Sequence, residues 1–310
     1  MKKTLHILYY TIISILIPLP CLSVSPQKGN ILFIDEFNEN SIIPDSSIWK
    51  LCTYGNHTWG QHFKNVEGYE NVKVENGVLK LKVSKDKNSY KNGGIRTTSG
   101  FPCNTRLEVK AKLTKLVKGG FPAIWQMPMD APQWPRGGEI DLMEWVQGTP
   151  NDIYQTVHTY FINGDNGSAG ATNPNRPTNF DITQYHVYAA DRTEEAIIFY
   201  IDGKETWRYP NQHLPEEKMQ YPFCQYKYDI ILNFSLGGDL NGNPTWPGKI
   251  NDDDLPGEMW IDWVKVSSLS LNPQLHSRSA TYIKRNGLLI RKITIKSSRP
   301  FQCAYHPLTP

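Results

Sequence analysis

Hydrophobic and polar residues alternate in short runs along most of the chain, and turn residues separate the runs. The clearest runs are NVKVENGVLKLKVS (71–84), TRLEVKAKLTK (105–115), AIIFYIDGKETWRY (196–209), DIILNFSLGG (229–238) and MWIDWVKVSS (259–268). A period of two is typical of β-strands with one buried face, and almost no stretch has the helical period. Regular spacing of such runs between residues 30 and 266 predicts an all-β, antiparallel sandwich.

Turn signals separate the expected strands of this region. Asn76-Gly77 and Asp202-Gly203 each stand between alternating runs. Both dipeptides tolerate the positive φ of a type I′ turn, so each predicts a hairpin. Segments 146–156, 162–184 and 239–256 are rich in Asn, Gly, Pro and Asp and are expected to be surface loops. No repeat or internal linker is visible, so residues 30–267 are expected to form one domain.

The two ends of the chain differ from this domain. Residues 1–25 combine Lys2 and Lys3 with an apolar stretch from Leu5 to Leu19, which is typical of a secretory signal. An uncleaved anchor is the alternative, but two prolines end the apolar stretch short of a full span. Cys21 follows it directly and could carry a lipid that attaches the protein to a membrane. We therefore expect a bacterial protein that is secreted, periplasmic or a cell-surface lipoprotein.

The C-terminal segment 268–310 is basic. Its residues 282–296, YIKRNGLLIRKITIK, would form a hairpin about Asn286-Gly287. This segment could bind an anionic surface or polysaccharide, or be a solvated appendage without a partner.

Charge and composition narrow the class of protein. The formal net charge is +3, but the two N-terminal lysines and the basic C-terminal segment account for it. The rest of the chain has 24 basic and 30 acidic residues, which does not favour nucleic-acid binding. The chain has nine tryptophans, more than a plain structural core needs, which indicates that some of them stack against rings of a ligand. The five cysteines lack metal-finger spacing, and one disulfide could form among the last four.

Three carboxylates crowd the sequence RGGEIDLMEWVQG at 136–148. Prolines and glycines on both sides leave too little room for a helix, whereas a short strand fits. On a regular strand Glu139 and Asp141 would share a face and Glu144 would point to the other. A β-bulge near Leu142–Met143 would bring all three acids to one face, since a bulge places two residues opposite one. Ile140 and one of Leu142 or Met143 would then enter the core.

This spacing suits a pair of catalytic carboxylates. Four effective steps separate the Cα atoms of Glu139 and Glu144 by about 13 Å. If the two side chains lean toward each other, their carboxyl groups can come within the roughly 5–5.5 Å that separates the two carboxyl groups of a retaining glycosidase. Asp141 could share a proton with Glu139 and keep the charges apart. Taken alone, the three acids also fit an exposed acidic face or a Ca²⁺ site.

The wider pattern resembles glycoside hydrolase family 16, the laminarinase and lichenase group. The motifs that carry the resemblance are GGFPAIWQMP…QWPRGGEIDLMEW (119–145), YQTVHTYF (154–161), DEFN (35–38), NGVLKLKV (76–83), FYIDGK (199–204), LNFSLGG (232–238) and IDWVKV (261–266). The resemblance implies a β-jelly-roll with a cleft on its concave sheet and retaining endo-hydrolysis of a β-linked polysaccharide. It assigns Glu139 as nucleophile, Asp141 as assisting carboxylate and Glu144 as general acid/base.

The same resemblance suggests residues that bind the substrate. Trp125 and Trp134 would be sugar platforms, whereas Trp145 should face the opposite side and pack. His158 aligns with a family histidine near the cleaved bond, although a lone histidine is commonly structural. Further cleft candidates are Asn233, Trp246 and Arg96, and a role for Arg96 within the sheet surface is an equal alternative.

The resemblance also implies a structural Ca²⁺ and no catalytic cofactor. Asp262 would supply the side-chain ligand, with backbone carbonyls near Glu36 and Gly77, as oxygen ligands suit this ion. One departure concerns Asp191-Arg192, where many family members have Glu-Trp, so packing or a subsite should differ there.

The expected activity is hydrolysis of a β-glucan with β-1,3 or mixed β-1,3/1,4 bonds by a monomer. The first alternative is the same chemistry on a β-galactoside polymer: agar, porphyran or a mucin-type galactose–N-acetylglucosamine chain. The second is a non-catalytic carbohydrate-binding sandwich, which would not need an acid pair at this separation.

Overall fold

The computed structural model describes residues 27–38, 41–52, 68–87, 89–164, 175–240, 242–270, 283–285 and 288–290. The chain divides into two compact units, one of residues 28–270 and one of the two terminal segments. The expected signal and lipidation segment, residues 1–25, lies outside the described residues. Within the described part, no helix has the length and apolar character needed to span a bilayer.

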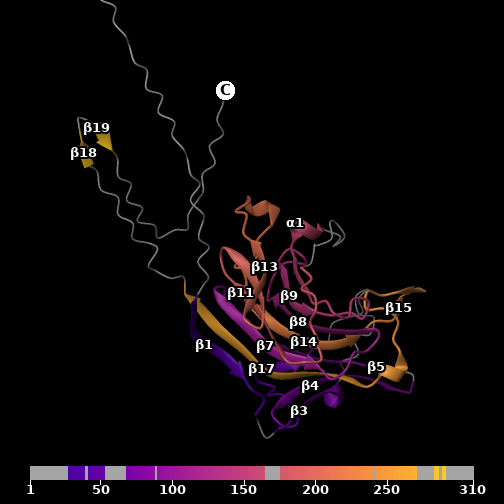
Figure 1. Cartoon of the computed structure of the whole chain (residues 1–310). Coiled ribbons are helices and arrows are strands. Elements are labelled where there is room, and N and C mark those ends of the chain that lie inside the picture. Colours follow the sequence, from indigo (N-terminus) through magenta and orange to yellow (C-terminus); the bar gives the residue numbers. More distant parts are fainter. Residues whose placement is uncertain are drawn as a thin grey trace, which may run out of the picture. The chain divides into compact units, whose positions relative to one another are not determined.

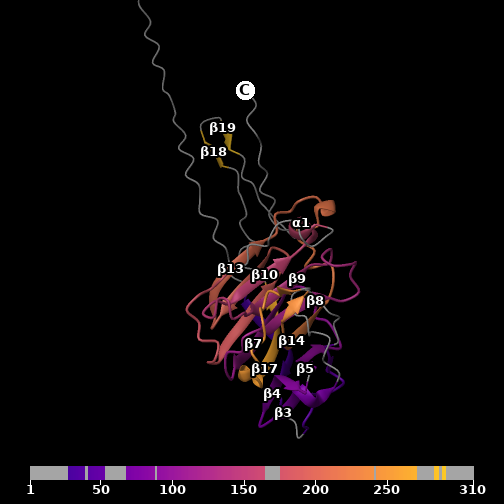
Figure 2. The ribbon, with the colours of Figure 1, turned by 90° about the vertical axis from the view of Figure 1, so that its right-hand side faces the viewer.

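Residues 28–270 form two antiparallel sheets (Figure 1). In the larger sheet the strands run in the order β13 (Lys204–Pro210), β12 (Ala196–Ile201), β11 (His186–Arg192), β7 (Thr105–Leu113), β17 (Gly257–Ser270), β4 (Val78–Asp86) and β3 (Val72–Glu75), while β1 (Gln27–Asp35) pairs with β17 and β5 (Ser89–Lys91) with β4. The smaller sheet has the order β10 (Tyr154–His158), β9 (Glu139–Glu144), β8 (Gly120–Pro128), β14 (Tyr228–Leu236), β6 (Gly93–Thr97) and β2 (Trp49–Leu51). Figure 2 shows β10, β9, β8 and β14 side by side. The prediction of an all-β sandwich is confirmed.

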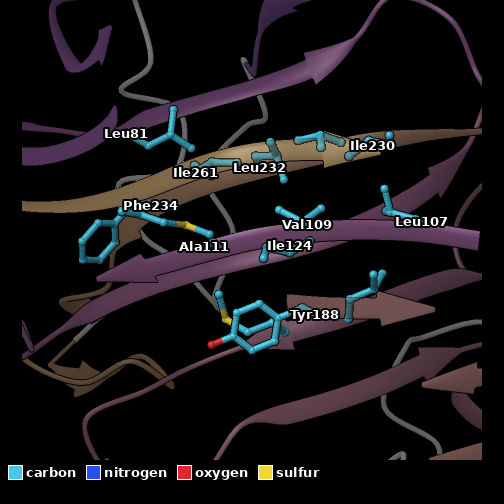
Figure 3. Close-up of a cluster of buried hydrophobic side chains, with 14 of the residues drawn as sticks. Leu81, Leu107, Val109, Ala111, Ile124, Tyr188, Ile230, Leu232, Phe234 and Ile261 are labelled. Atoms are coloured by element: carbon cyan, nitrogen blue, oxygen red, sulfur yellow. The ribbon is translucent and has the colours of Figure 1, made fainter. Parts of the chain in front are cut away.

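The core lies between the two sheets, as Figure 3 shows. Leu81, Val109 and Ile261 of the larger sheet pack toward Ile124 and Leu232 of the smaller one, and all five are fully buried. Strands such as β4 and β7 contribute alternate residues to this layer, which is the period-two pattern visible in the sequence. Strand β14 is buried along its whole length, so its other face is also covered.

The two hairpin predictions are confirmed. Asn76-Gly77 joins β3 to β4, with φ of 55° and 71° at the two positions. Asp202-Gly203 joins β12 to β13, with φ of 51° and 78°. Both pairs therefore adopt the left-handed conformation for which these residues are suited.

Short elements fill the connections. They are α1 (Tyr160–Asn163), the 3₁₀ turns η1 (Tyr69–Asn71), η2 (Glu216–Lys218) and η3 (Asp252–Asp254), and the ribbon of β15 (Asp239–Leu240) with β16 (Asn243–Pro244). The expected loop at 146–156 is shorter than predicted, because β10 begins at Tyr154. In the C-terminal segment, β18 (Ile283–Arg285) pairs antiparallel with β19 (Leu288–Ile290), and the intervening Asn286-Gly287 lies outside the described residues.

Candidate active site

Strand β9 carries a β-bulge at Leu142. On β8, Trp125 pairs with Asp141 and Ile124 pairs with Met143, so Leu142 has no partner there. On β10, two steps from Tyr154 to Thr156 match three steps from Glu144 to Asp141. The predicted bulge is confirmed from both neighbouring strands. One detail differs from the prediction, because both Leu142 and Met143, not one of them, enter the core.

The bulge places the three acids on the face of the smaller sheet that points away from the core. Directly paired residues of an antiparallel sheet project to the same side. Glu139 pairs with His158 of β10, and Glu144 pairs with Tyr154 of β10 and Ala123 of β8. We call this surface, which carries Glu139, Asp141, Glu144 and their cross-strand neighbours, the acidic face.

Glu144 is a partly buried carboxyl in a negative neighbourhood. Burial raises the pKa of Glu144 well above its usual value, and the charges of Asp141 and Glu139 raise it further. His158 and a hydrogen bond with Thr156 oppose this shift without cancelling it. Such a group holds its proton at a pH where an ordinary glutamate has lost it, which is what a general acid requires.

Asp141 lies between the two glutamates and is almost fully buried. Burial raises its pKa well above the usual value, and the charge of Glu139 and a hydrogen bond between the two carboxyls add to the effect. A protonated Asp141 can therefore donate the hydrogen bond that joins it to Glu139. His158 also contacts Asp141, with its Nε2 3.4 Å from Asp141 Oδ2.

Glu139, Asp141 and His158 could in principle hold a metal ion. Their ligand atoms lie within 4.8 Å of one another, and they are the one such group of His, Asp, Glu or Cys among the described residues. The hydrogen bond between Asp141 and Glu139 already accounts for the two close carboxyls. No metal is needed to explain the arrangement.

Trp134 approaches the nucleophile candidate from the loop before β9. Its indole Nε1 donates a hydrogen bond of 2.5 Å to Glu139 Oε2, and its ring lies 5.6 Å from that of His158. The Trp134 side chain is 36% exposed, so part of the ring is available to a ligand. The sequence placed Trp134 at the site as a sugar platform, but the hydrogen bond to Glu139 had no signal in the sequence.

Trp125 lies next to Asp141 on the acidic face, and Asn233 holds it there. The indole Nε1 of Trp125 donates to Asn233 Oδ1 at 2.8 Å. The Asn233 amide in turn donates to the Phe121 carbonyl and to Ser235 Oγ. Asn233 is only 1% exposed. It was expected to contact sugar, but its place below the surface means that it orients Trp125 instead.

Trp246 and Arg96 also lie at this face, each with contacts inside the protein. Trp246 packs edge-on against Phe121 and Tyr154, at centroid distances of 5.3 and 5.1 Å. Arg96 lies two strands from Trp125 in the same row and its Nε donates to Asp229 Oδ2 at 2.6 Å. Because Asp229 is fully buried, this ion pair fixes the guanidinium within the sheet surface. The structure favours the alternative in which Arg96 serves the sheet.

The one expected side-chain ligand of calcium, Asp262, is engaged with a lysine. Asp262 pairs with Lys110, with Nζ and Oδ2 2.8 Å apart. A lysine ammonium therefore already neutralises the one side-chain ligand that was expected. Gly77 lies in the β3–β4 turn, where an added Cβ would come within 2.9 Å of Asn38 Oδ1, and Glu36 is exposed. The charge of Asp262 is thus offset by Lys110 in this structure.

Removing divalent cations is therefore expected to leave the fold unchanged. We expect the melting temperature to shift by less than about 2 °C, because no net charge is uncovered and a 1 kcal/mol loss alone would shift a domain of this size by about 2–4 °C. Differential scanning fluorimetry with EDTA and with added CaCl₂ measures this. A drop of 5 °C or more in EDTA, restored by calcium, would show that the ion displaces Lys110.

The sequence departure at Asp191-Arg192 changes packing and adds no subsite. Asp191 pairs with Arg106 on the outer side of the larger sheet, where the Tyr200 hydroxyl also donates to it. Arg192 is completely buried.

Near Arg192, Cys103 and Cys224 form a disulfide, which the sequence allowed but did not assign. Trp145 packs in the core and donates from Nε1 to the Pro150 carbonyl, as expected for the residue after the bulge.

A family model described as "Glycosyl hydrolases family 16" matches residues 59–265. Among proteins of assigned function, a "Beta-glucanase" from Rhodothermus marinus is 30% identical over 254 residues, which cover 76% of this chain and 84% of that protein. A "Keratan-sulfate endo-1,4-beta-galactosidase" from Sphingobacterium multivorum is 29% identical over 256 residues. That match covers 80% of this chain, which spans 57% of the length of the galactosidase.

A solved structure has much higher identity. It is described as "Prominent members of the human gut microbiota express endo-acting O-glycanases to initiate mucin breakdown". Its sequence is 67% identical, and the match covers 78% of this chain and all of the other, with a TM-score of 0.75.

Proposed function

Because this chain belongs to glycosyl hydrolase family 16, we propose that it is a retaining, endo-acting β-glycosidase of mucin-type glycans, cleaving galactose–N-acetylglucosamine chains at galactose. The observation that carries the substrate is the 67% identity to a structure described with endo-acting O-glycanases and mucin breakdown. The galactosidase relative points to the same sugar. Family membership and the acid pair together argue against a non-catalytic binding module.

A β-glucan is the second candidate. It was the first expectation from the sequence, and the relative from Rhodothermus marinus that is named a β-glucanase supports it. Both candidates use the same three acids, so the acidic face supports either. The preference for the galactoside rests on the difference between 67% and 30% identity.

In the first chemical step, a carboxylate oxygen of Glu139 attacks the anomeric carbon. The bond from that carbon to the glycosidic oxygen breaks, and Glu144 gives its proton to the departing oxygen. The raised pKa of Glu144 keeps this proton available at a pH where an ordinary glutamate has lost it. The product of this step is a glycosyl ester of Glu139 and a free chain end.

In the second step, water attacks the same carbon and Glu144 takes the proton from it. The ester bond to Glu139 breaks, and the two inversions together retain the anomeric configuration. The proton between the two carboxyls stays on Asp141 while Glu139 attacks and forms the ester, and Asp141 donates it in a hydrogen bond to the Glu139 carboxylate again when the ester breaks. Trp134 holds the other oxygen of Glu139 in place.

An export route agrees with such a substrate. Mucin-type glycans lie outside the cell, and residues 1–25 have the pattern of a secretory signal, with Cys21 placed for lipidation. The Cys103–Cys224 disulfide supports this proposal, since disulfides persist mainly in oxidising compartments.

Digestion of a panel of polymers tests the proposed function. The panel is mucin O-glycans, keratan sulfate, agarose, porphyran, laminarin and barley glucan, with product size and linkage read by mass spectrometry. We expect oligosaccharides with galactose at the new reducing end from mucin glycans and at least 100-fold slower release from laminarin. Faster cleavage of laminarin would select the β-glucan candidate, and tight binding without any cleavage would contradict both.

A further inference from the structure

Arg192 is a buried arginine whose hydrogen bonds within the described part of the chain go to main-chain carbonyls and not to a carboxylate. Its guanidinium donates to four main-chain carbonyls: those of Phe101 and Pro102 at 2.7 Å each, Phe223 at 2.8 Å and Tyr226 at 3.4 Å. Burial lowers its pKa to about 10, so it still carries its charge at neutral pH. The four bonds all come from the two terminal nitrogens, while the buried Nε has no hydrogen-bond partner among the described residues. Rotation of the guanidinium would break bonds from a buried charge, so the four carbonyls favour one orientation.

The fixed guanidinium lies over the ring of Tyr228. The distance from the Arg192 Cζ to the ring centroid is 4.5 Å, which is typical of a cation–π contact. Tyr228 begins β14 and is itself fully buried. Arg192 therefore determines where the Tyr228 ring lies, because the ring packs against a group that the four carbonyls hold in one orientation.

The Tyr228 hydroxyl connects this pair to the catalytic strand. It donates a short hydrogen bond to the carbonyl of Gly137, two residues before Glu139. Gly138 follows with φ of +83°, and an added Cβ there would lie 2.8 Å from the Tyr228 hydroxyl and 2.7 Å from Phe223. The Gly137-Gly138 turn therefore packs against Phe223 and Tyr228, and the Gly137 carbonyl accepts the hydrogen bond of the Tyr228 hydroxyl.

We propose that Arg192 and Tyr228 are positioning residues that hold the Gly137-Gly138 turn, and through it the Glu139 carboxylate, beside Asp141. Neither residue touches the substrate. This role rests on the proposed glycosidase function, because it concerns the nucleophile of that reaction. It also gives a purpose to the Asp191-Arg192 departure, which replaces an expected tryptophan by a charged group with a fixed direction.

The disulfide supports the same arrangement near Arg192. Cys103 follows Phe101 and Pro102, and Cys224 follows Phe223, so the bond ties together two segments whose carbonyls the guanidinium binds. Holding these segments together keeps the four acceptors in place. The guanidinium and the disulfide thus fix one cluster beneath the turn.

Tyr228→Phe tests the positioning role, with Tyr221→Phe as the matched control. Tyr228→Phe keeps the ring over Arg192 and removes only the hydroxyl bonded to Gly137. Tyr221→Phe also removes a tyrosine hydroxyl bonded to a main-chain carbonyl, that of Thr193 at 2.7 Å, in the same cluster. We expect kcat of Tyr228→Phe on the cleaved polymer to fall about 10- to 100-fold, since small displacements of a nucleophile cost this much. KM should stay within about twofold and the melting temperature close to that of Tyr221→Phe.

A second measurement does not depend on the substrate. Hydrogen–deuterium exchange of peptides covering residues 136–144 should be faster in Tyr228→Phe than in wild type and unchanged in Tyr221→Phe. Equal kcat and equal exchange in both variants would overturn the proposal, as would a fall in kcat that Tyr221→Phe shares. If wild type cleaves no polymer of the panel, the proposed function fails, and the exchange comparison still supports or overturns the positioning role.

Discussion

Glu144→Gln is expected to lower kcat on the natural polymer by about 10²–10⁴-fold, the range for loss of a general acid. Gln has the size of Glu but cannot give a proton to the departing oxygen. An aryl glycoside whose leaving group needs no proton should lose far less in the first step. Rates on the polymer and on such an aryl substrate, measured for wild type and variant, separate loss of the proton from loss of binding.

Azide distinguishes the two glutamates. In Glu144→Ala, azide should attack the glycosyl ester and give a β-glycosyl azide, because the ester at Glu139 still blocks the other face. In Glu139→Ala, azide should enter the space left by the nucleophile and give an α-glycosyl azide from a substrate with a good leaving group. The opposite pair of products would exchange the two roles.

The pH profile follows from the direction of the pKa shift. Glu144 has a raised pKa in the folded protein, so the reactive protonated form persists to higher pH and kcat/KM of wild type falls as pH rises through that pKa. Glu144→Gln cannot ionise at this position and should lose that alkaline limb. An unchanged limb in the variant would assign it to another group.

Stability provides the control for folding. A carboxyl with a raised folded pKa makes the wild type less stable as pH rises from the unfolded value of about 4.3 through the folded one. Gln has no such cost, so the melting temperature of Glu144→Gln should equal or exceed that of wild type at neutral pH. A large drop instead would mean that lost activity reflects unfolding.

The sequence predicted the fold well because its signals were local. Alternation revealed the strands, and Asn76-Gly77 and Asp202-Gly203 identified two turns that the structure contains. The bulge in β9 could also be predicted, since a parity conflict among three acids on one strand has few physical solutions.

The supporting residues of the site could not be predicted in the same way. Asn233 and Trp134 act through hydrogen bonds to Trp125 and Glu139, and such partners depend on which strands become neighbours. The disulfide joins cysteines 121 residues apart, and the sequence offered several pairings. Arg192 stood out in the sequence as a departure from a family pattern, but its four carbonyl partners exist only in the folded chain.

Deleting Leu142 is expected to leave the enzyme active, although it removes a buried residue from the catalytic strand. Leu142 is the unpaired residue of the bulge, so its deletion makes β9 regular and preserves the pairs Asp141–Trp125, Met143–Ile124 and Glu144–Ala123. Glu139, Asp141 and Glu144 would then be two residues apart in turn and still share a face. The lost leucine should cost about 2–5 kcal/mol of stability, as for other large core truncations. We expect kcat within about 100-fold of wild type at a temperature where the variant is folded.

The matched variant inserts one alanine after Leu142. The strand must then either absorb a second extra residue or slip by one, and a slip turns Glu144 toward the core and Trp145 outward. A carboxyl aimed into an apolar layer is neutralised or excluded, so activity on the polymer should fall by more than 10³-fold, in the range of Glu144→Gln. The deletion costs more core volume than the insertion, whereas the insertion should cost more activity. If the deletion is the inactive one and the insertion works, register on β9 does not govern this site and the bulge is not what aligns the acids.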